Sequence, residues 1–235
     1  KSLVDLVESE EDEVKTVAFV PVKLNSERLP GKNLKRFDDG APLISVLLEK
    51  LNRMVGTVFD QAYVYCSSEE IRGYLPDRIS FLKRPERLDG ATVRGTEIYG
   101  SFVSTVDADV YALCHATSPF VTSAHIAECV EAVREGGHDS AFCAKRIQNF
   151  LWQGSRPLNF ILNDPPRTQE MDPIFMEQST PYVFSRECWE INGARSGTNP
   201  YICECSEIEC IDIDYPEDFE LANVVYMNLL KGRDD

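Results

Sequence analysis

Apolar and polar residues alternate along this chain in blocks that indicate strands and helices in turn. Short, mostly apolar runs predict buried strands over residues 17–22, 61–66, 79–82, 109–114 and 139–144. Further strands are expected over 182–185, 201–205 and 208–213. Apolar residues at helical spacing predict helices over 42–55, 95–106, 123–134 and 217–230, and another helix should begin with Ser67 or Ser68 as its N-cap. Strands that alternate with helices are typical of βαβ units, so we expect an α/β fold with a largely parallel sheet.

Residues 148–180 interrupt this rhythm, because Asn, Pro and Gly become frequent there. We interpret the segment as an excursion from the main sheet. From the residues alone, a local hairpin packed on its own subunit would explain it. The predicted organisation is an acidic segment over residues 1–16 followed by one domain over 17–235.

Composition limits the classes of function. A net charge of −15 argues against a nucleic-acid polymer or an anionic membrane as partner, since both would be repelled. No apolar run approaches the ~20 residues of a membrane span, and residues 1–15 lack the basic-then-apolar pattern of a signal peptide. The eight cysteines lie mostly inside apolar patterns, which suits reduced thiols and a cytoplasmic location. The chain does not begin with Met, which fits either a piece of a longer fusion polypeptide or ordinary frayed ends.

A cationic loop follows the first predicted strand. Lys23, Arg28 and Lys32 lie close together there, in a chain that is otherwise strongly acidic. Pro30-Gly31 predicts a turn in which Gly31 can supply a positive φ. Open α/β sheets bind their ligands at the carboxyl ends of the strands, where this loop would lie. Three cations and the backbone N–H groups of such a loop suit a polyphosphate.

Two carboxylates near the end of the chain form a second candidate site. On a strand, Asp212 and Asp214 would project from the same face, because side chains at i and i+2 do so. Paired carboxylate oxygens suit Mg²⁺, which keeps several waters and shares the remaining positions with phosphates. The alternative is that acidic residues complement the dipole of the next helix. That role suits Glu217 and Asp218 better, because Asp212 and Asp214 would repel each other without a cation.

Other catalytic and metal motifs find little support. The spacing Cys203-x-Cys205-x4-Cys210 differs from a standard C-x2-C zinc pair and has no matching second pair, so we expect ordinary buried thiols there. The sequence contains no Walker A run, no Gly-x-Gly-x-x-Gly and no Gly-x-Ser-x-Gly. A P-loop enzyme, a dinucleotide-binding enzyme and a serine hydrolase are therefore not expected.

The motif Pro-x-Lys-x-x-Ser-x-Arg-Leu-Pro-Gly-Lys-Asn, which begins at Pro21, resembles the sugar-acid cytidylyltransferase family. Members activate sialic acid, Kdo or phosphonates as CMP conjugates, and the likeness covers about residues 17–230. It implies a Rossmann-like, GT-A-like nucleotidyltransferase fold, a three-layer sandwich with a mixed and mostly parallel sheet. It also implies a homodimer in which the excursion closes over the partner's site, with Trp152 and Phe160 as interface anchors. The local hairpin stays open as the alternative to this arm.

The resemblance further implies roles for individual residues. Lys23, Arg28, Lys32, Asp212 and Asp214 would be catalytic, with the two aspartates holding Mg²⁺. The nucleotide would contact Val22, Lys23, Leu24, Asn25, Ser26, Arg28, Lys32, Ser67, Arg84 and Thr117. The acceptor would contact His115, Lys145, Arg167 and Gln169, with Arg146 as a further cation beside Lys145.

The expected reaction transfers CMP from CTP to an anionic acceptor and releases pyrophosphate. His115 stands where CMP-sialic acid synthetases typically carry Gln, and it can either bind the acceptor or make a purely structural hydrogen bond. A compact pocket of His115, Arg167 and Lys145 or Arg146 favours a small phosphonate such as 2-aminoethylphosphonate, whose ionised oxygen needs no general base. The alternatives are a CMP-N-acylneuraminate synthetase and, from another class, a CTP-binding sensor without turnover.

Overall fold

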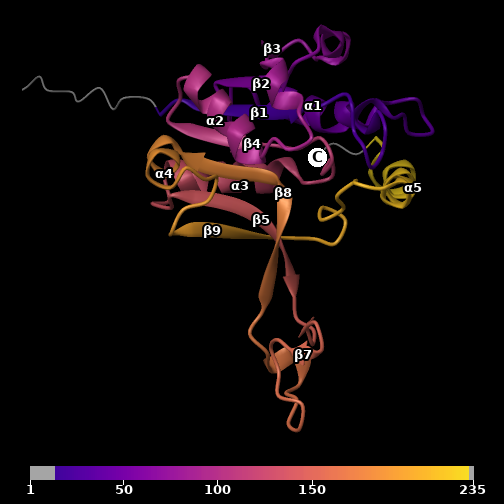
Figure 1. Cartoon of the computed structure of the whole chain (residues 1–235), viewed down its shortest axis with the longest axis vertical. Coiled ribbons are helices and arrows are strands. Elements are labelled where there is room, and N and C mark those ends of the chain that lie inside the picture. Colours follow the sequence, from indigo (N-terminus) through magenta and orange to yellow (C-terminus); the bar gives the residue numbers. More distant parts are fainter. Residues whose placement is uncertain (1–13, 233–235) are drawn as a thin grey trace, which may run out of the picture.

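A computed structural model describes residues 14–232, and most of the acidic N-terminal segment therefore lies outside the described residues. Within them, seven strands form one twisted sheet in the order β3-β2-β1-β4-β8-β5-β9, and a long arm leaves the body between β5 and β8 (Figure 1). The strands are β1 Thr16–Val22, β2 Gln61–Cys66, β3 Ile79–Lys83, β4 Val110–Leu113, β5 Ser140–Ile147, β8 Ile174–Ser185 and β9 Pro200–Cys205. All pair in parallel except β8, which runs antiparallel to both of its neighbours.

Helices cover both faces of the sheet and complete the three layers. The principal helices are α1 Leu43–Met54, α2 Gly95–Thr105, α3 Ser123–Arg134, α4 Arg186–Asn192 and α5 Pro216–Val225. α1 and α3 bury one apolar stripe each against one face of the sheet, whereas α2 and α4 pack on the opposite face. Stacking of Phe102 on Phe19, with ring centroids 4.1 Å apart, joins α2 to β1 at the centre of that second core. α5 packs beside Phe37 and Leu43 in a third apolar cluster.

Short single-turn helices connect the larger elements. They are η1 Lys32–Leu34, η2 Glu69–Tyr74, η3 Glu86–Asp89 and η4 Thr168–Glu170. Ser68 is the N-cap of η2, because its hydroxyl accepts a hydrogen bond from the backbone N–H of Glu70. The sequence therefore predicted the cap correctly, although the helix that follows is a 3₁₀-helix.

Three predicted elements differ from the structure. The expected strand over 208–213 is wrong: the chain turns after Cys205 and runs to α5 without joining the sheet. β8 is much longer than predicted, because residues 174–177 pair with residues 144–147 at the extended end of β5. The last helix is shorter, since α5 ends at Val225 and continues as the π-helix η5 Tyr226–Leu230.

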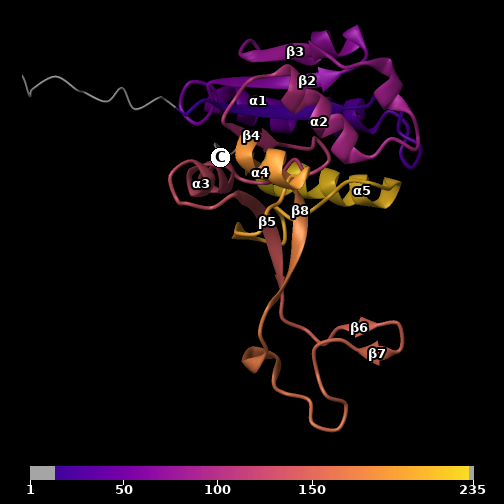
Figure 2. The ribbon, with the colours of Figure 1, turned by 60° about the vertical axis from the view of Figure 1, so that its left-hand side comes forward.

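The predicted excursion is real but narrower than residues 148–180. It comprises residues 148–173, carried away from the body by the extended ends of β5 and β8, as both ribbon views show (Figures 1 and 2). Two short strands, β6 Trp152–Gln153 and β7 Arg156–Pro157, form a hairpin near its tip. Phe160 packs on Phe150 and Trp152 there, with ring centroids 4.7 and 5.4 Å apart. In the described residues, no helix is long and apolar enough to cross a membrane.

Candidate active site

The cationic loop and the carboxylate pair meet in one open cavity of about 720 Å³. The cavity lies beyond the carboxyl ends of β1 and β4, the edge predicted for a ligand. Its lining includes nine of the predicted site residues: Lys23, Asn25, Ser26, Arg28, Lys32, His115, Thr117, Asp212 and Asp214. Segments from opposite ends of the sequence therefore share one site.

Asp214 forms ion pairs with two residues of the cationic loop. Its carboxylate oxygens lie 2.6 Å from a guanidinium nitrogen of Arg28 and 2.8 Å from Nζ of Lys32. The Arg28 side chain is 54% exposed and that of Lys32 only 14%, so the lysine pair is the better shielded from solvent. The loop is thus held against the carboxylates even without a ligand.

Asp212 is oriented by hydroxyl groups. Ser118 Oγ donates to one carboxylate oxygen at 3.3 Å, and Ser179 Oγ donates to the other at 3.0 Å. Between the two aspartates, the side chain of Ile213 is fully buried, and its N–H donates to the carbonyl of Thr117 at 2.8 Å. The alternation expected for a strand is therefore kept by an extended segment outside the sheet, and both carboxylates still reach the cavity.

Backbone geometry shapes the cationic loop. Gly31 has φ 66°, the left-handed conformation predicted for it, and it precedes η1. Asn33 donates from its amide to the carbonyl of Lys23 at 2.8 Å and so closes the loop on itself. Nζ of Lys23 reaches across to the carbonyl of Gly90 at 3.2 Å. This contact ties the loop to the segment that follows η3.

A smaller cavity of about 250 Å³ adjoins the first and shares Lys23, Asn25 and Asp89 with it. The predicted nucleotide residues Leu24 and Ser67 line this smaller cavity. Asp89 separates the two spaces. Burial opposes its charged form, but hydrogen bonds from Ser67 and Arg84 outweigh that effect and lower the pKa of Asp89.

Arg84 reaches this region only through Asp89. Its side chain is 1% exposed, pairs with the carboxylate of Asp89 at 2.6 Å and lies over the ring of Tyr65. Its Nε is buried without a hydrogen-bond partner among the described residues. Val22 is likewise buried, so its side chain cannot line the cavity. Both residues lie behind the site in the structure rather than on its surface.

Both ring nitrogens of His115 already have partners. Nδ1 lies 2.5 Å from the carbonyl oxygen of Ser179, so it must carry the proton and donate. Nε2 lies 3.2 Å from the Tyr99 hydroxyl and accepts from it. Burial, the largest effect, lowers the pKa of His115. The imidazole is thus a neutral, fixed wall of the cavity, which matches the structural alternative for this residue.

Four predicted cationic or polar residues lie outside both cavities. Lys145 forms an ion pair with Glu207, and Arg146 forms one with Glu204 at 3.6 Å. Arg167 and Gln169 lie on the arm, where Arg167 is 75% exposed and pairs with Glu170. The compact cationic pocket predicted around His115 is therefore not formed within the described part of one chain.

The sequence analysis did not identify Ser118, Ser179 and Asp89 as residues of the site. Ser118 directly follows Thr117, which was predicted to contact the nucleotide, so its proximity to the site was available as a signal. Ser179 lies on β8 and becomes a partner of Asp212 only because that strand is antiparallel and runs past β4. Asp89 follows no strand directly, and only the buried pair with Arg84 places it.

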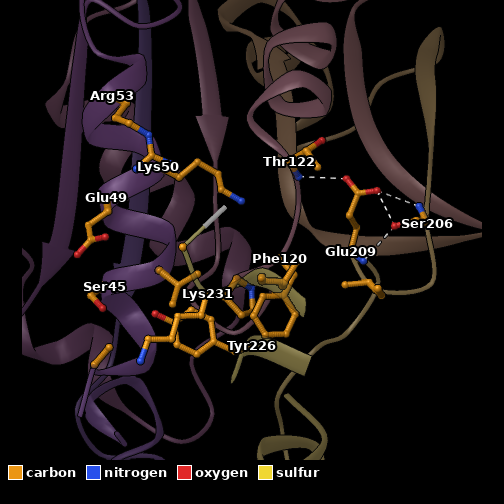
Figure 3. Close-up of a pocket in the computed structure, with 16 residues that line it drawn as sticks. Ser45, Glu49, Lys50, Arg53, Phe120, Thr122, Ser206, Glu209, Tyr226 and Lys231 are labelled. Atoms are coloured by element: carbon orange, nitrogen blue, oxygen red, sulfur yellow. Dashed lines mark hydrogen bonds between the residues drawn. The ribbon is translucent and has the colours of Figure 1, made fainter. Parts of the chain in front are cut away.

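A separate cavity of about 420 Å³ lies between α1 and the C-terminal segment, with Phe120 and Tyr226 on its walls (Figure 3). None of the predicted site residues is among its described lining residues. At its far end, Glu209 accepts hydrogen bonds from Thr122 and Ser206 (Figure 3).

Comparison with known proteins agrees with the motif at the start of the chain. A family model described as Cytidylyltransferase matches residues 17–228. The chain belongs to the cytidylyltransferase family. Its relatives include the N-acylneuraminate cytidylyltransferase of Oncorhynchus mykiss, 26% identical over 222 residues, and N-acylneuraminate cytidylyltransferase A of Danio rerio, 26% identical over 216 residues. The matches cover 85% and 87% of this chain, but only 48% and 49% of the lengths of the two relatives. The chain thus spans about half the length of the curated relatives it matches.

Solved structures confirm the fold of this family member. A CMP:2-keto-3-deoxy-manno-octonic acid synthetase complexed with CTP superimposes with a TM-score of 0.65 at 14% identity, covering 91% of this chain and 98% of that one. A 4-diphosphocytidyl-2C-methyl-D-erythritol synthase from Anaerococcus prevotii superimposes with a TM-score of 0.64 at 11% identity, covering 92% and 97%. The predicted α/β nucleotidyltransferase fold with a mixed, mostly parallel sheet is confirmed.

Proposed function

We propose that this chain transfers CMP from CTP to an acidic sugar and releases pyrophosphate. One observation carries the proposal: Lys23, Arg28 and Lys32 line the same cavity as Asp212 and Asp214, although about 180 residues separate the two groups along the chain. Cations alone would bind any polyphosphate. Cations next to paired carboxylates are suited to a nucleoside triphosphate together with a divalent metal.

The residues of the loop would hold the triphosphate. Lys32 is the most enclosed of the three cations and already points at Asp214, so it is placed to bind the phosphate nearest the metal. Arg28 is more exposed and can turn toward the departing pyrophosphate. Asn25 and Lys23 line both cavities, which places them between the phosphates and a base lodged in the smaller cavity beside Leu24 and Ser67.

The donor set at the carboxylate end fits Mg²⁺. Asp212 has a hydroxyl partner on each carboxylate oxygen, an arrangement that orients a metal-binding carboxylate and leaves lone pairs for an ion. Asp214 now neutralises Arg28 and Lys32, and these cations would be taken over by phosphate oxygens when the nucleotide binds. Mg²⁺, when bound, supplies charge neutralisation at the phosphate oxygens.

Catalysis would rest on positioning and charge. The acceptor hydroxyl gives up its proton to solvent as its oxygen attacks the α-phosphorus. The new P–O bond forms, and the bond to pyrophosphate breaks in line with the attack. Lys32 and Arg28 stabilise the negative charge that collects on pyrophosphate. His115 holds Ser179, and Ser179 holds Asp212, so the histidine acts as a positioning residue in this proposal.

A keto-sugar acid is the acceptor we favour. The curated relatives are named as N-acylneuraminate cytidylyltransferases, and a structure of similar fold is named as a synthetase for a keto-deoxy sugar acid. The predicted small phosphonate depended on a compact cationic pocket, and the structure leaves Lys145, Arg146 and Arg167 outside the cavity. The open cavity of about 720 Å³ also has more room than a small phosphonate would need beside the triphosphate.

We further propose that the arm joins two copies of the chain. Several of its apolar side chains are exposed, with Ile161 70% and Trp152 52% accessible in the single chain. The same arm carries Arg167 and Gln169, and neither residue lines the cavities of its own chain. Both ribbon views show the arm projecting away from the body of the molecule (Figures 1 and 2). In a homodimer these two residues could reach the partner's cavity and meet the carboxylate of the acceptor.

Pyrophosphate release from CTP tests the proposed function. We would assay the chain with Mg²⁺ and a panel of N-acetylneuraminate, Kdo and 2-aminoethylphosphonate. Release with a sugar acid supports the proposal, and release with the phosphonate alone would contradict the choice of acceptor. CTP binding without release with any of these acids would instead favour a CTP-binding sensor.

A further inference from the structure

Four of the eight cysteines gather at one place, and none of them lines either of the two cavities described for the nucleotide. Cys129 lies on α3, Cys143 on β5, and Cys203 and Cys205 on β9. Cys143 and Cys203 are register partners on adjacent parallel strands, and Cys203 and Cys205 share a strand face at i and i+2. α3 packs directly over both strands, so all four thiols point into the same layer.

Three of the thiols are spaced as in a tetrahedral metal site, and the fourth adjoins one of them. Cys129 Sγ and Cys143 Sγ are 3.9 Å apart. Sulfur ligands bound at about 2.3 Å to a tetrahedral zinc ion lie about 3.8 Å apart. The ligand atoms of Cys129, Cys143 and Cys203 all lie within 4.8 Å of one another, and so do those of Cys203, Cys205 and His125. Cys205 is thus close to Cys203 but not to every thiol of the first group, so its Sγ would turn toward the other three to become the fourth ligand. Cys203 therefore belongs to both groups and marks the centre of the cluster.

The four cysteines are buried, and the neighbouring His125 is partly exposed to solvent. Cys129 and Cys143 are fully buried, Cys203 is 1% exposed and Cys205 is 8% exposed. His125, one turn before Cys129 on α3, is 28% exposed and places Nδ1 3.6 Å from Cys205 Sγ. A closed ring of thiolates is typical of structural zinc sites.

A buried carboxylate supports the histidine from outside the cluster. Glu209 is 6% exposed and accepts a hydrogen bond from His125 Nδ1 at 2.6 Å. The N–H groups of Thr122 and Ser206 each donate to Glu209 at 3.0 Å, and Figure 3 shows this carboxylate held between them. Because the same Nδ1 faces both Glu209 and Cys205 Sγ, His125 lies beside the thiols as a fixed neighbour and not among the ligands.

From this geometry we propose that Cys129, Cys143, Cys203 and Cys205 bind one thiophilic metal ion, Zn²⁺, with His125 and Glu209 as the outer pair. Each thiol loses its proton to solvent as the ion binds, and four sulfur–metal bonds form without any change of oxidation state. Soft thiolate ligands select Zn²⁺ over Mg²⁺, so this site would not compete with Asp212 and Asp214 for their ion.

The site would stabilise the edge of the sheet that supports the carboxylate pair. β9 is the last strand of the sheet and has a neighbour on one side only. The chain leaves β9 after Cys205 and reaches Asp212 seven residues later. An ion that joins β9 to β5 and α3 would fix the start of that segment.

The test uses the full chain purified without chelator. We expect about one zinc per chain by mass spectrometry of the metal. After removal of zinc, titration with Co²⁺ should produce a thiolate-to-cobalt absorption band, and a large excess of Mg²⁺ should not displace the ion. Absence of that band in the wild-type protein overturns the proposal, whatever the variants do.

Matched serine variants locate the site. Cys203→Ser removes the shared ligand and should abolish the cobalt band. Cys210→Ser should keep the band, because Cys210 lies five residues after Cys205 but outside both ligand groups. An unchanged band in Cys203→Ser also overturns the proposal. If Cys203→Ser does not fold, protection of four thiols from a thiol reagent by Zn²⁺ in the folded wild-type protein provides the same decision.

Discussion

Asp212 and Asp214 differ in their partners, and this difference predicts different consequences of mutation. Asp212 accepts two hydroxyl hydrogen bonds, whereas Asp214 accepts from two cations. We expect Asp212→Asn and Asp214→Asn each to lower kcat for pyrophosphate release by about 10²–10³. Only Asp214→Asn should also lower the free energy of unfolding, by about 1 kcal/mol, because it leaves Lys32 partly buried beside a neutral side chain.

Glu220→Gln is the control for this pair, since it removes an exposed carboxylate from α5 near the same site. Steady-state kinetics and urea denaturation should find it unchanged in both properties. Near-normal activity of Asp212→Asn would show that this carboxylate does not serve the reaction.

His115 predicts a dependence of stability on pH. Burial lowers its pKa in the folded state, while the unfolded chain keeps a value of about 6.5. The unfolded state therefore binds the proton more readily than the folded state. The contribution of the neutral His115 to the free energy of unfolding is thus fully present above the unfolded pKa, and it is lost as the pH falls through the folded pKa. His125 has a raised pKa because hydrogen bonding and charge attraction from Glu209 outweigh burial, which acts in the opposite direction.

The two effects oppose each other, so wild type and His115→Gln must be compared at each pH. The difference in free energy of unfolding between them should shrink as the pH is lowered from about 8 to about 5. Urea denaturation followed by circular dichroism measures it. A difference that stays constant over this range would mean that the pKa of His115 is not lowered in the folded protein.

At the scale of elements, the arm leads to a prediction about self-association of the chain. Its exposed apolar residues are of the kind that interfaces bury. Ile161→Asp should weaken self-association at least about tenfold, since each 1.4 kcal/mol of lost burial changes the dissociation constant by that factor. Sedimentation velocity over a range of concentrations measures the effect.

Ile191→Asp is matched to this change, because Ile191 is 73% exposed but lies on α4, away from the arm. It should leave association as in the wild type. A wild-type chain that stays monomeric at high micromolar concentration would contradict the proposed dimer.

Elements with one continuous apolar signal could be predicted from the sequence. Residues 61–66 form β2 as expected, because nearly every side chain in that run is apolar and the strand is enclosed by β1 and β3. Residues 208–213 carry a similar signal but do not form a strand. There, Ser206 and Thr122 bind the carboxylate of Glu209 and turn the chain, and the N–H of Ile213 bonds to Thr117 instead of to a strand. These partners are distant in sequence, so the local pattern could not show them.

The candidate active site likewise contains residues that the sequence could identify and residues that it could not. The cationic loop could be found because Lys23, Arg28 and Lys32 are close together in the sequence and Pro30-Gly31 marks the turn that leads into η1. Arg84 could not be placed, because an arginine after a strand reads as a surface residue whether or not it is buried against Tyr65 and paired with Asp89. The cysteine cluster was missed for a related reason: two of its members, Cys129 and Cys143, come from elements that only the fold brings to β9.

For the whole molecule, charge is distributed so that a strongly acidic protein can still bind a polyanion. The net charge of −15 repels a nucleoside triphosphate at long range, whereas three cations line the cavity at short range. In the proposed function, Mg²⁺ would lower the charge of the nucleotide and would add the two carboxylates to the contacts that hold it. We therefore expect CTP to bind more tightly with Mg²⁺ than without it, when only the three cations hold the nucleotide.

Thermal unfolding tests this dependence. With CTP and Mg²⁺ at about 100 times the dissociation constant, the folded state should gain about 2.7 kcal/mol, which corresponds to a rise in Tm of about 5–10 °C for a chain of this size. CTP without Mg²⁺ should give a smaller rise. Asp212→Asn should give the same rise with and without Mg²⁺, because the hydroxyl-oriented carboxylate is gone while Lys23, Arg28 and Lys32 remain. If Mg²⁺ still enhanced the rise fully in Asp212→Asn, the metal would have to bind through other residues, and the joint site for nucleotide and metal would be wrong.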